Sequence, residues 1–261
     1  MRYIFFSVTI LIILSFGCTN SDDLLLNEKT EKDTVLVGIE AEVNRIIGAK
    51  DSLVMVPSLR YAKGETETYM AKMYGQNQLT RWIREEQISN QSILGRDYYY
   101  QGGNLILIKD SESIFNGETE EYTERLLYVQ DNAIYKALEK HQYTEDNMFL
   151  DTLYQAVQIS MAELDVEKPY RALQQQGEFA MHFDQFLLID PQSYLIVENI
   201  DKTMNAALFI IEGDSLLNRL YENPEAYKGQ KLWIYHSFKE MNGIERTIYE
   251  GAVLVKAPTV Q

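Results

Sequence analysis

Three copies of one short pattern mark the first half of the chain: YGQNQL at residues 74–79, YQGGNL at 100–105 and YVQDNAI at 128–134. In each copy a tyrosine is followed by a polar turn and then by an apolar segment. Aligned on the turn residues Asn77, Gly103 and Asn132, the copies are 26 and 29 residues apart. Asn and Gly tolerate the positive φ that tight hairpin turns require. The pattern therefore predicts three consecutive β-hairpins.

The three hairpins are expected to pair with one another. A lone hairpin is only marginally stable in water, so three in succession should form one antiparallel meander with a shared apolar face. In the middle copy, Leu105 and Leu107 point one way while Ile106 and Ile108 point the other. The middle hairpin is therefore predicted to be central and covered on both sides.

A helix is predicted over residues 34–49, ahead of the first hairpin. Apolar residues from Leu36 to Ile47 fall on one helical stripe, and Gly48 suits a C-terminal cap. A strand is the competing interpretation, because apolar residues also alternate through residues 35–43. The adjacent pair Ile46 and Ile47 favours the helix.

The hairpin units resemble the loose hairpin repeats of many uncharacterised bacterial lipoproteins and, distantly, MORN-type repeats. They lack the regular Gly and Trp spacing of MORN units, so the resemblance implies an architecture and carries over no binding residues. If exposed, four aromatic residues would form a ligand platform: Tyr74, Trp82, Tyr98 and Tyr128. Cross-strand aromatic packing is the alternative that we favour.

A connector helix is predicted after the meander. Thr144 and the two acidic residues that follow it are typical of a helix start, and apolar residues from Leu150 to Leu164 keep helical spacing. Pro169 and the polar run after it are expected to end this helix. The connector and its linker are thus placed at residues 144–176, after a helix-plus-meander domain at residues 34–143.

The remaining module, residues 177–261, is predicted to be a five-stranded barrel like an OB-fold. A short helix over residues 215–221 lies between the third and fourth predicted strands, which is the OB-fold order. The strands are expected at residues 178–188, 194–200, 206–212, 231–238 and 245–256. The predicted fold class is therefore α+β and mostly antiparallel β: a hairpin meander with a flanking helix, a helical connector and an OB-like barrel.

Residues 1–17 are predicted to be a signal peptide. Arg2 precedes an apolar run too short to span a bilayer, which takes about 20 residues, but suited to a signal-peptide core. Residues 14–18, LSFGC, resemble a bacterial lipobox, and this implies lipidation of Cys18; plain secretion is the alternative. Residues 18–33 are predicted to be a flexible tether. Its run SDD at residues 21–23 resembles the surface-export signal of Bacteroidota-type lipoproteins, with a solvated linker as the alternative.

Composition limits the partners. The chain has 24 Lys and Arg against 39 Asp and Glu, a formal charge of −15. Because basic side chains supply most non-specific affinity for nucleic acid, such a partner is not expected. The barrel module alone has a net charge of −5, from 12 acidic and 7 basic residues. Cys18 is the only cysteine, so the core must hold without disulfides.

One catalytic hypothesis comes from residues 213–216, Gly-Asp-Ser-Leu, which resemble the GDSL block of esterases with Ser215 as nucleophile. That chemistry needs a histidine base within reach, and His236 has no Asp three residues before it, which departs from the esterase pattern. Asp214 as the N-cap of the short helix is the alternative explanation that we favour. No catalytic residue is therefore assigned.

Metal and modification sites are weighed in the same way. His182 and Asp184 share one face of a strand as two candidate metal ligands, but no third ligand is suggested, and His141 is expected to face solvent. We expect neither a metal nor another cofactor.

The triplets that begin at Asp33, Asp51, Asp151 and Asp214 resemble an O-glycosylation signal of exported Bacteroidota proteins. Thr34 and Ser52 are the candidate acceptors, whereas Thr152 falls inside the predicted connector helix.

The sequence thus predicts a lipid-anchored protein of the bacterial outer membrane, facing the periplasm or the exterior. Its expected role is non-catalytic binding of an envelope protein or a glycan. The alternatives are a weak GDSL-like esterase centred on Ser215 and an immunity or inhibitor lipoprotein directed against a basic partner.

Overall fold

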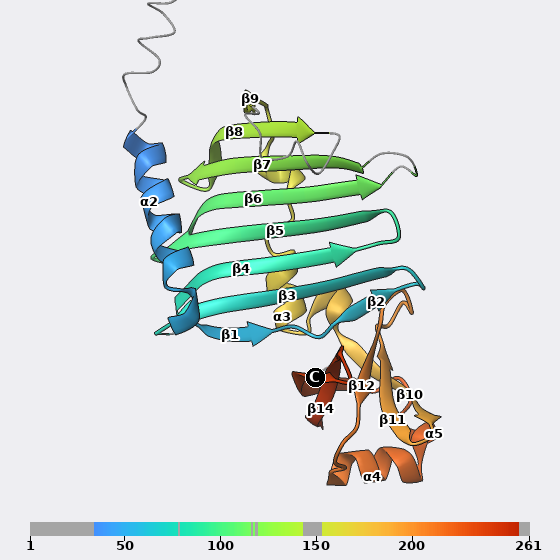
Figure 1. Cartoon of the computed structure of the whole chain (residues 1–261). Helices are drawn as coiled ribbons and strands as arrows, with labels where there is room; N and C mark the ends of the chain where they lie inside the picture. The colour runs from blue at the N-terminus through green and yellow to red at the C-terminus, as the bar shows by residue number, and fades with distance from the viewer. Residues whose placement is uncertain (1–33, 78, 116, 118–119, 143–152, 256–261) are drawn as a thin grey trace, which may run out of the picture. The chain divides into compact units, whose positions relative to one another are not determined.

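A computed structural model describes residues 34–77, 79–115, 117, 120–142 and 153–255 (Figure 1). The protein is mostly antiparallel β, as the sequence predicts. The predicted signal peptide, the tether, Cys18 and Thr152 lie outside the described residues. Within the described ranges, no helix is long and apolar enough to cross a membrane. The chain divides into a short unit that ends at Gly38 and a large unit over Ile39–Gln261.

The first part of the chain forms the predicted helix and meander. The helix α2 spans Thr34–Gly48 and is followed by the 3-10 turn η1 at Lys50–Ser52. The strands are β1 (Val54–Pro57), β2 (Tyr61–Lys63), β3 (Glu67–Gln76), β4 (Leu79–Ile88), β5 (Ser92–Gln101), β6 (Asn104–Phe115), β7 (Glu120–Gln130) and β8 (Ala133–Gln142). From β3 to β8 each strand pairs antiparallel with the next, and β1 and β2 both pair with β3. The three predicted hairpins are therefore confirmed as one meander.

Each of the three hairpins closes in the same way. The last pairs before the turns are Gln76↔Leu79, Gln101↔Asn104 and Gln130↔Ala133. The described turn residues between them have positive φ, from 51° at Asp131 to 88° at Gly103, which explains the Asn and Gly of the pattern. Asn77 is the first turn residue, whereas Gly103 and Asn132 are the second. The structural spacing of the copies is therefore 25 and 29 residues, from 76 to 101 and from 101 to 130.

The middle hairpin is covered on both sides, as predicted. On one face Tyr98, Tyr100 and Ile108 are buried against the chain between Val157 and Leu173. On the other face Tyr99 and Leu107 are buried. From Ile39 onward, α2 lies against this second face, where Glu40, Val43, Asn44 and Ile47 line a hollow together with residues of β4 to β7 (Figure 1).

The predicted connector helix is wrong for the part of it that is described. The chain here forms the short strand β9 (Gln155–Ala156) and the 3-10 turn η3 (Met161–Glu163), and it becomes helical only at α3 (Lys168–Leu173). Val157 and Ile159 before that turn, and Leu164 and Val166 after it, pack onto the sheet. Pro169 is in the first turn of α3, where a missing N–H costs nothing, so it begins a helix instead of ending one.

The C-terminal module is a closed five-stranded barrel. It follows the turn η4 (Gly177–Phe179) and consists of β10 (Met181–Ile189), β11 (Gln192–Glu198), β12 (Asn205–Phe209), β13 (Lys231–Met241) and β14 (Ile244–Leu254), with α4 (Ser215–Glu222) and α5 (Pro224–Tyr227) between β12 and β13. The strands pair in the circular order β10, β11, β12, β14, β13, and only β12 and β14 are parallel. This order confirms the predicted OB-like barrel.

The barrel and the start of the meander share one hydrophobic core. Phe179 is fully buried, and its ring centroid lies 4.8 Å from that of Tyr61 and 5.0 Å from that of Tyr69. The Tyr61 hydroxyl donates to the carbonyl oxygen of Ala172 at 2.8 Å. The strands β2 and β12 also pair, at Ala62 and Asn205. Apolar packing therefore continues across the boundary predicted at residues 176 and 177.

Candidate functional site

A hollow lies on the face of the sheet against which α2 packs, at the end of the strands away from the three hairpin turns. It has a volume of about 480 Å³, and we call it the trough. Four rows of side chains cross this face in register, and the trough lies over the two rows farthest from the turns. Those rows are Glu86, Gly95, Ser111, Glu124 and Lys140, and Ile88, Ile93, Ser113, Tyr122 and Gln142.

Small residues on the two middle strands make the floor of the trough. Gly95 on β5 faces Ser111 on β6, and Ser113 is the next residue on the same face of β6. A Cβ atom at Gly95 would lie 3.5 Å from Arg84 Nη2 and 3.9 Å from the Ser111 carbonyl oxygen, which are ordinary contact distances. Larger side chains stand on β4 and β7 at either side. The hollow therefore results from residue size at matched positions of the register.

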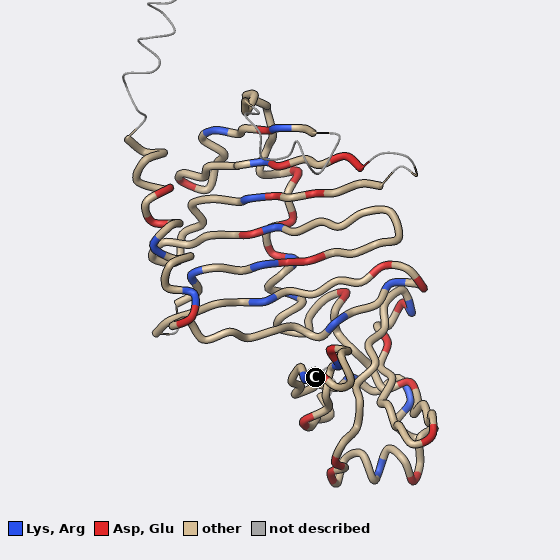
Figure 2. The backbone as a smooth tube through the Cα atoms, viewed as in Figure 1, with Lys and Arg blue, Asp and Glu red and all other residues tan. Residues whose placement is uncertain are grey.

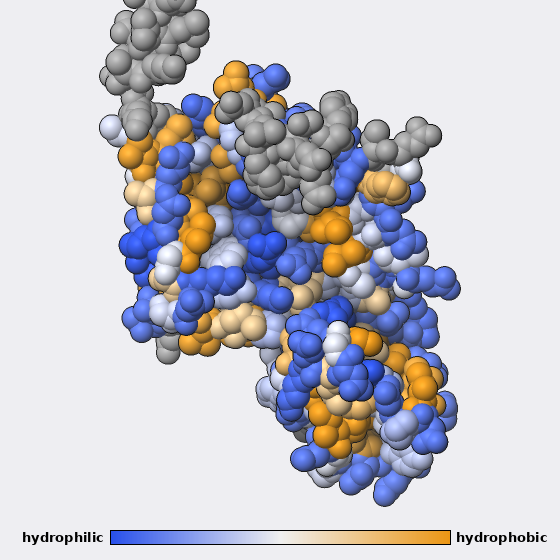
Figure 3. Space-filling model, viewed as in Figure 1, coloured by the Kyte–Doolittle hydropathy of each residue, from blue (hydrophilic) through white to orange (hydrophobic). Residues whose placement is uncertain are grey.

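One wall of the trough is apolar and open to solvent. Ile88 and Ile93 face each other across β4 and β5, and their side chains are 44% and 57% exposed. Figure 3, which views this face of the sheet, shows hydrophobic side chains grouped among hydrophilic ones. An exposed aliphatic pair beside a hollow is a typical feature of a binding surface.

The two cations that line the trough are already neutralised by carboxylates. The Arg84 guanidinium is 3.0 Å from Glu86 and 3.7 Å from Asp97, and Lys140 Nζ is 3.0 Å from Glu124. Burial alone would raise the pKa of Glu124. Hydrogen bonds from Tyr154 and two lysines have the larger, opposite effect, so the pKa is below its ordinary value. Glu124 therefore remains charged at neutral pH.

A third carboxylate, that of Glu120, stands at the open end of the trough. The Ser113 hydroxyl donates to Glu120 Oε1 at 2.5 Å and lowers the pKa of this carboxyl group. Among the described residues, Glu120 has no ion-pair partner. The trough consequently carries three carboxylates, those of Glu86, Glu120 and Glu124, against two cations.

The predicted aromatic platform does not form one exposed surface. Trp82, Tyr98 and Tyr128 are buried, and Tyr98 points to the opposite face of the sheet from the other two. The rings of Tyr74 and Trp82 stack across β3 and β4 with centroids 4.4 Å apart. The Tyr128 hydroxyl donates to Glu40 of α2 at 3.0 Å. Cross-strand packing, the alternative given above, accounts for these residues.

The opposite face of the meander carries a row of alternating charges. Neighbouring strands from β4 to β8 place the following residues side by side in register: Glu85, Arg96, Asp110, Arg125 and Glu139. Figure 2 shows that both signs of charge are interspersed over these strands. Opposite charges in adjacent strands stabilise one pairing register over its neighbours.

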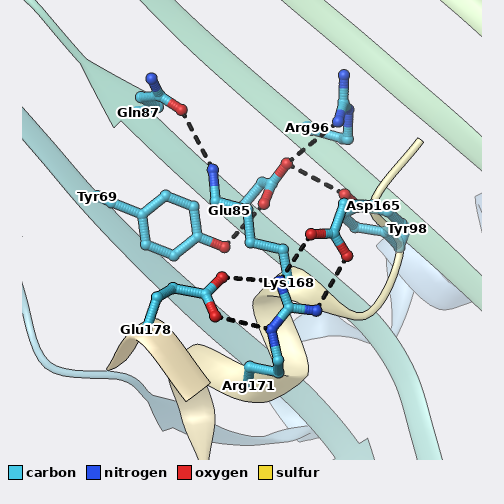
Figure 4. Close-up of polar contacts among 9 residues, drawn as sticks. All are labelled: Tyr69, Glu85, Gln87, Arg96, Tyr98, Asp165, Lys168, Arg171 and Glu178. Atoms are coloured by element: carbon cyan, nitrogen blue, oxygen red, sulfur yellow. Dashed lines mark hydrogen bonds and ion pairs between the residues drawn. The ribbon is translucent and has the colours of Figure 1, made fainter. Parts of the chain in front are cut away.

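The start of this row is the most deeply buried charged cluster in the described chain. Glu85 and Asp110 are 4% and 2% exposed, and Arg96 donates to both oxygens of Asp110 at 2.5 and 2.9 Å. Glu85 also accepts hydrogen bonds from Tyr69 at 2.8 Å and Tyr98 at 3.1 Å (Figure 4). These hydrogen bonds pair the buried carboxylates, so the cluster has a structural role in the folded sheet.

The Gly-Asp-Ser-Leu block begins α4. Asp214 is the N-cap, accepting from the backbone N–H of Leu217 at 2.8 Å, and its second oxygen accepts from the Tyr249 hydroxyl at 2.8 Å. Ser215 is the exposed first residue of the helix. No hydrogen bond joins Ser215 to a histidine within the described part of the chain, in which His236 lies on β13.

The other candidate residues are dispersed. His182 and Asp184 are on β10, and Asp184 Oδ1 is 3.3 Å from Lys228 Nζ. His141 is exposed on β8 between Glu139 and Thr123. No group of three or more potential metal ligands occurs among the residues whose placement is described.

The two candidate glycosylation sites are both exposed. Thr34 is the first residue of α2. Ser52 lies in η1, where its hydroxyl donates to the carbonyl oxygen of Ala49 at 2.7 Å.

The trough itself was not predicted from the sequence. Its floor residues Gly95 and Ser111 belong to no motif, and they become significant only when the register of β5 and β6 is known. Comparisons with protein-family models, with curated proteins and with solved structures gave no match.

Proposed function

We propose that this protein is a non-catalytic binding module of the bacterial envelope, held at the membrane by a lipid on Cys18, and that the trough is its ligand surface. The observation that carries the proposal is the trough, because an exposed aliphatic wall and a floor of small residues leave room for a ligand group on this face of the sheet. The esterase hypothesis is not extended, since the helix start explains Asp214 and Ser215.

The lipid anchor is supported by the lipobox-like residues 14–18. We expect the wild-type protein to incorporate labelled palmitate and to fractionate with outer membranes, whereas Cys18→Ala incorporates none. The measurement is metabolic labelling followed by membrane fractionation. Surface proteolysis of whole cells then distinguishes the periplasmic from the exterior face. Equal labelling of the two proteins would contradict the anchor.

The binding role is tested by placing the photo-crosslinker p-benzoylphenylalanine at Phe115, an exposed aromatic residue of β6 that pairs with Glu120 at the open end of the trough. We expect covalent adducts in native envelopes that disappear when Gly95→Leu fills the floor. The matched control is the same crosslinker at Ser215, an exposed serine on α4, whose adducts should not respond to Gly95→Leu. Adducts from Phe115 that persist unchanged in Gly95→Leu would count against the trough as the ligand surface.

A further inference from the structure

We infer that the trough binds a basic, amphipathic segment of a protein partner, with a Lys or Arg side chain of the partner lying over the floor between the carboxylates. The inference rests on the proposed function, because it names the ligand class of the same surface. Three features of the trough carry it: the balance of charges, the apolar wall and the small floor.

The balance of charges selects a cation. Three carboxylates are on the trough face, those of Glu86, Glu120 and Glu124, against the two cations Arg84 and Lys140. Both cations are within 3.0 Å of a carboxylate, so neither is available to an anionic ligand. Of these three, Glu120 has no cationic partner in the described chain. An added positive charge is therefore stabilised here, whereas an added carboxylate or phosphate is repelled.

The apolar wall selects an amphipathic side chain. A Lys or Arg side chain has an aliphatic stem and a charged head, and it lowers its free energy when the stem covers apolar surface while the head meets carboxylates. Ile88 and Ile93 supply that apolar surface beside the carboxylates of Glu86 and Glu120. A small hydrated metal cation would use the carboxylates but leave the two isoleucines exposed.

The floor limits the size of the bound group. Gly95 and Ser111 leave the middle of the face low, while α2 borders the hollow that continues toward the hairpin turns. Gly95 does not have positive φ, and an added Cβ makes only ordinary contacts. A larger residue at position 95 is therefore expected to fill the floor and leave the strand pairing intact.

The test uses three synthetic peptides that differ only in charge: KLKLKLK, SLSLSLS and ELELELE. Each is titrated into the full chain by calorimetry at about 50 mM and about 300 mM salt. We expect the Lys peptide to bind best and more weakly at high salt. Gly95→Leu, which keeps the net charge, should weaken its binding at least about tenfold, and Glu120→Lys about fivefold.

Two control variants separate the trough from the general acidity of the protein. Gly38→Leu adds the same side chain where a Cβ meets nothing within 4 Å, and Glu65→Lys reverses an exposed charge at the turn between β2 and β3. Both should bind the Lys peptide like the wild type. Equal binding by all variants, or no binding of the Lys peptide, would overturn the inference. Tighter binding of the Ser or Glu peptide that is lost in Gly95→Leu would also overturn the ligand class, and it would leave the trough as a binding surface.

Discussion

Arg96→Ala is expected to lower the free energy of unfolding by about 3–5 kcal/mol, because it leaves two buried carboxylates without their cation. Arg96 bridges Asp110 and Glu85, whose side chains are 3% and 5% exposed. Breaking a buried ion pair costs far more than its net contribution, since the remaining charge stays desolvated. Urea denaturation followed by circular dichroism measures the loss.

The matched control is Arg171→Ala. Arg171 also contacts two carboxylates, Asp165 and Glu178, each at 2.7 Å, but these groups are 54% and 36% exposed (Figure 4). Exposed pairs of this kind contribute up to about 1 kcal/mol. The two variants therefore differ mainly in burial, and losses of similar size would contradict the account of the charged row.

A conservative variant covers the case in which Arg96→Ala does not accumulate as folded protein. Arg96→Lys keeps the positive charge but loses the two parallel hydrogen bonds to Asp110, so an intermediate loss of stability is expected. If Arg96→Lys were as stable as the wild type, the two parallel hydrogen bonds to Asp110 would contribute nothing to the free energy of unfolding.

The hairpins were predictable because their cause is local. A two-residue turn with positive φ needs Asn, Asp or Gly. These residue types are present at the turns, as Gly102, Gly103 and Asn132, and can be recognised in the sequence. The barrel was predictable for a related reason, since five short strands with one helix after the third permit few arrangements. In the meander every strand lies beside the next along the chain, and in the barrel this holds for β10 to β12 and for β13 with β14.

The charged row and the trough were not predictable, because both depend on pairings across longer connections. Arg96 and Asp110 belong to one hairpin, but Glu85 and Arg125 reach the row from adjacent hairpins. Their register is set by the loops between hairpins, which carry no comparable turn signal. Gly95 and Ser111 belong to one hairpin, but a bulge between Tyr99 and Tyr100 shifts their register by one residue, so counting from the turn alone would pair Gly95 with Asp110.

The connector shows how a periodic pattern can mislead. Apolar residues from Val157 to Leu164 fit a helix by spacing, but the sheet beneath them offers a ready apolar surface, and packing on it outweighs helical propensity. Pro169 was compatible with either end of a helix, and only its structural context shows that it lies in the first turn.

Phe179→Ala is expected to destabilise the meander and the barrel together, by about 3–5 kcal/mol, the usual cost of removing a buried aromatic ring. Phe179 is fully buried just before the barrel begins, and its ring packs against Tyr61 and Tyr69 of the meander. The cavity would therefore lie in the core that the two parts share. Phe115→Ala is the matched control, because Phe115 is 53% exposed and its loss should cost less than about 1 kcal/mol.

The chain contains its own reporters for this test, since its two tryptophans are Trp82 in the meander and Trp233 in the barrel. Trp233→Phe leaves the meander reporter alone, and Trp82→Phe leaves the barrel reporter alone. If the shared core makes the large unit cooperative, the two tryptophans report the same urea transition. The two transitions should coincide with Phe179 in place and also in the Phe179→Ala variant. Phe179→Ala would then shift both transitions to lower urea by the same amount. A shift of the Trp233 transition alone would mean that the barrel unfolds separately, so that Phe179 stabilises the barrel without coupling it to the sheet.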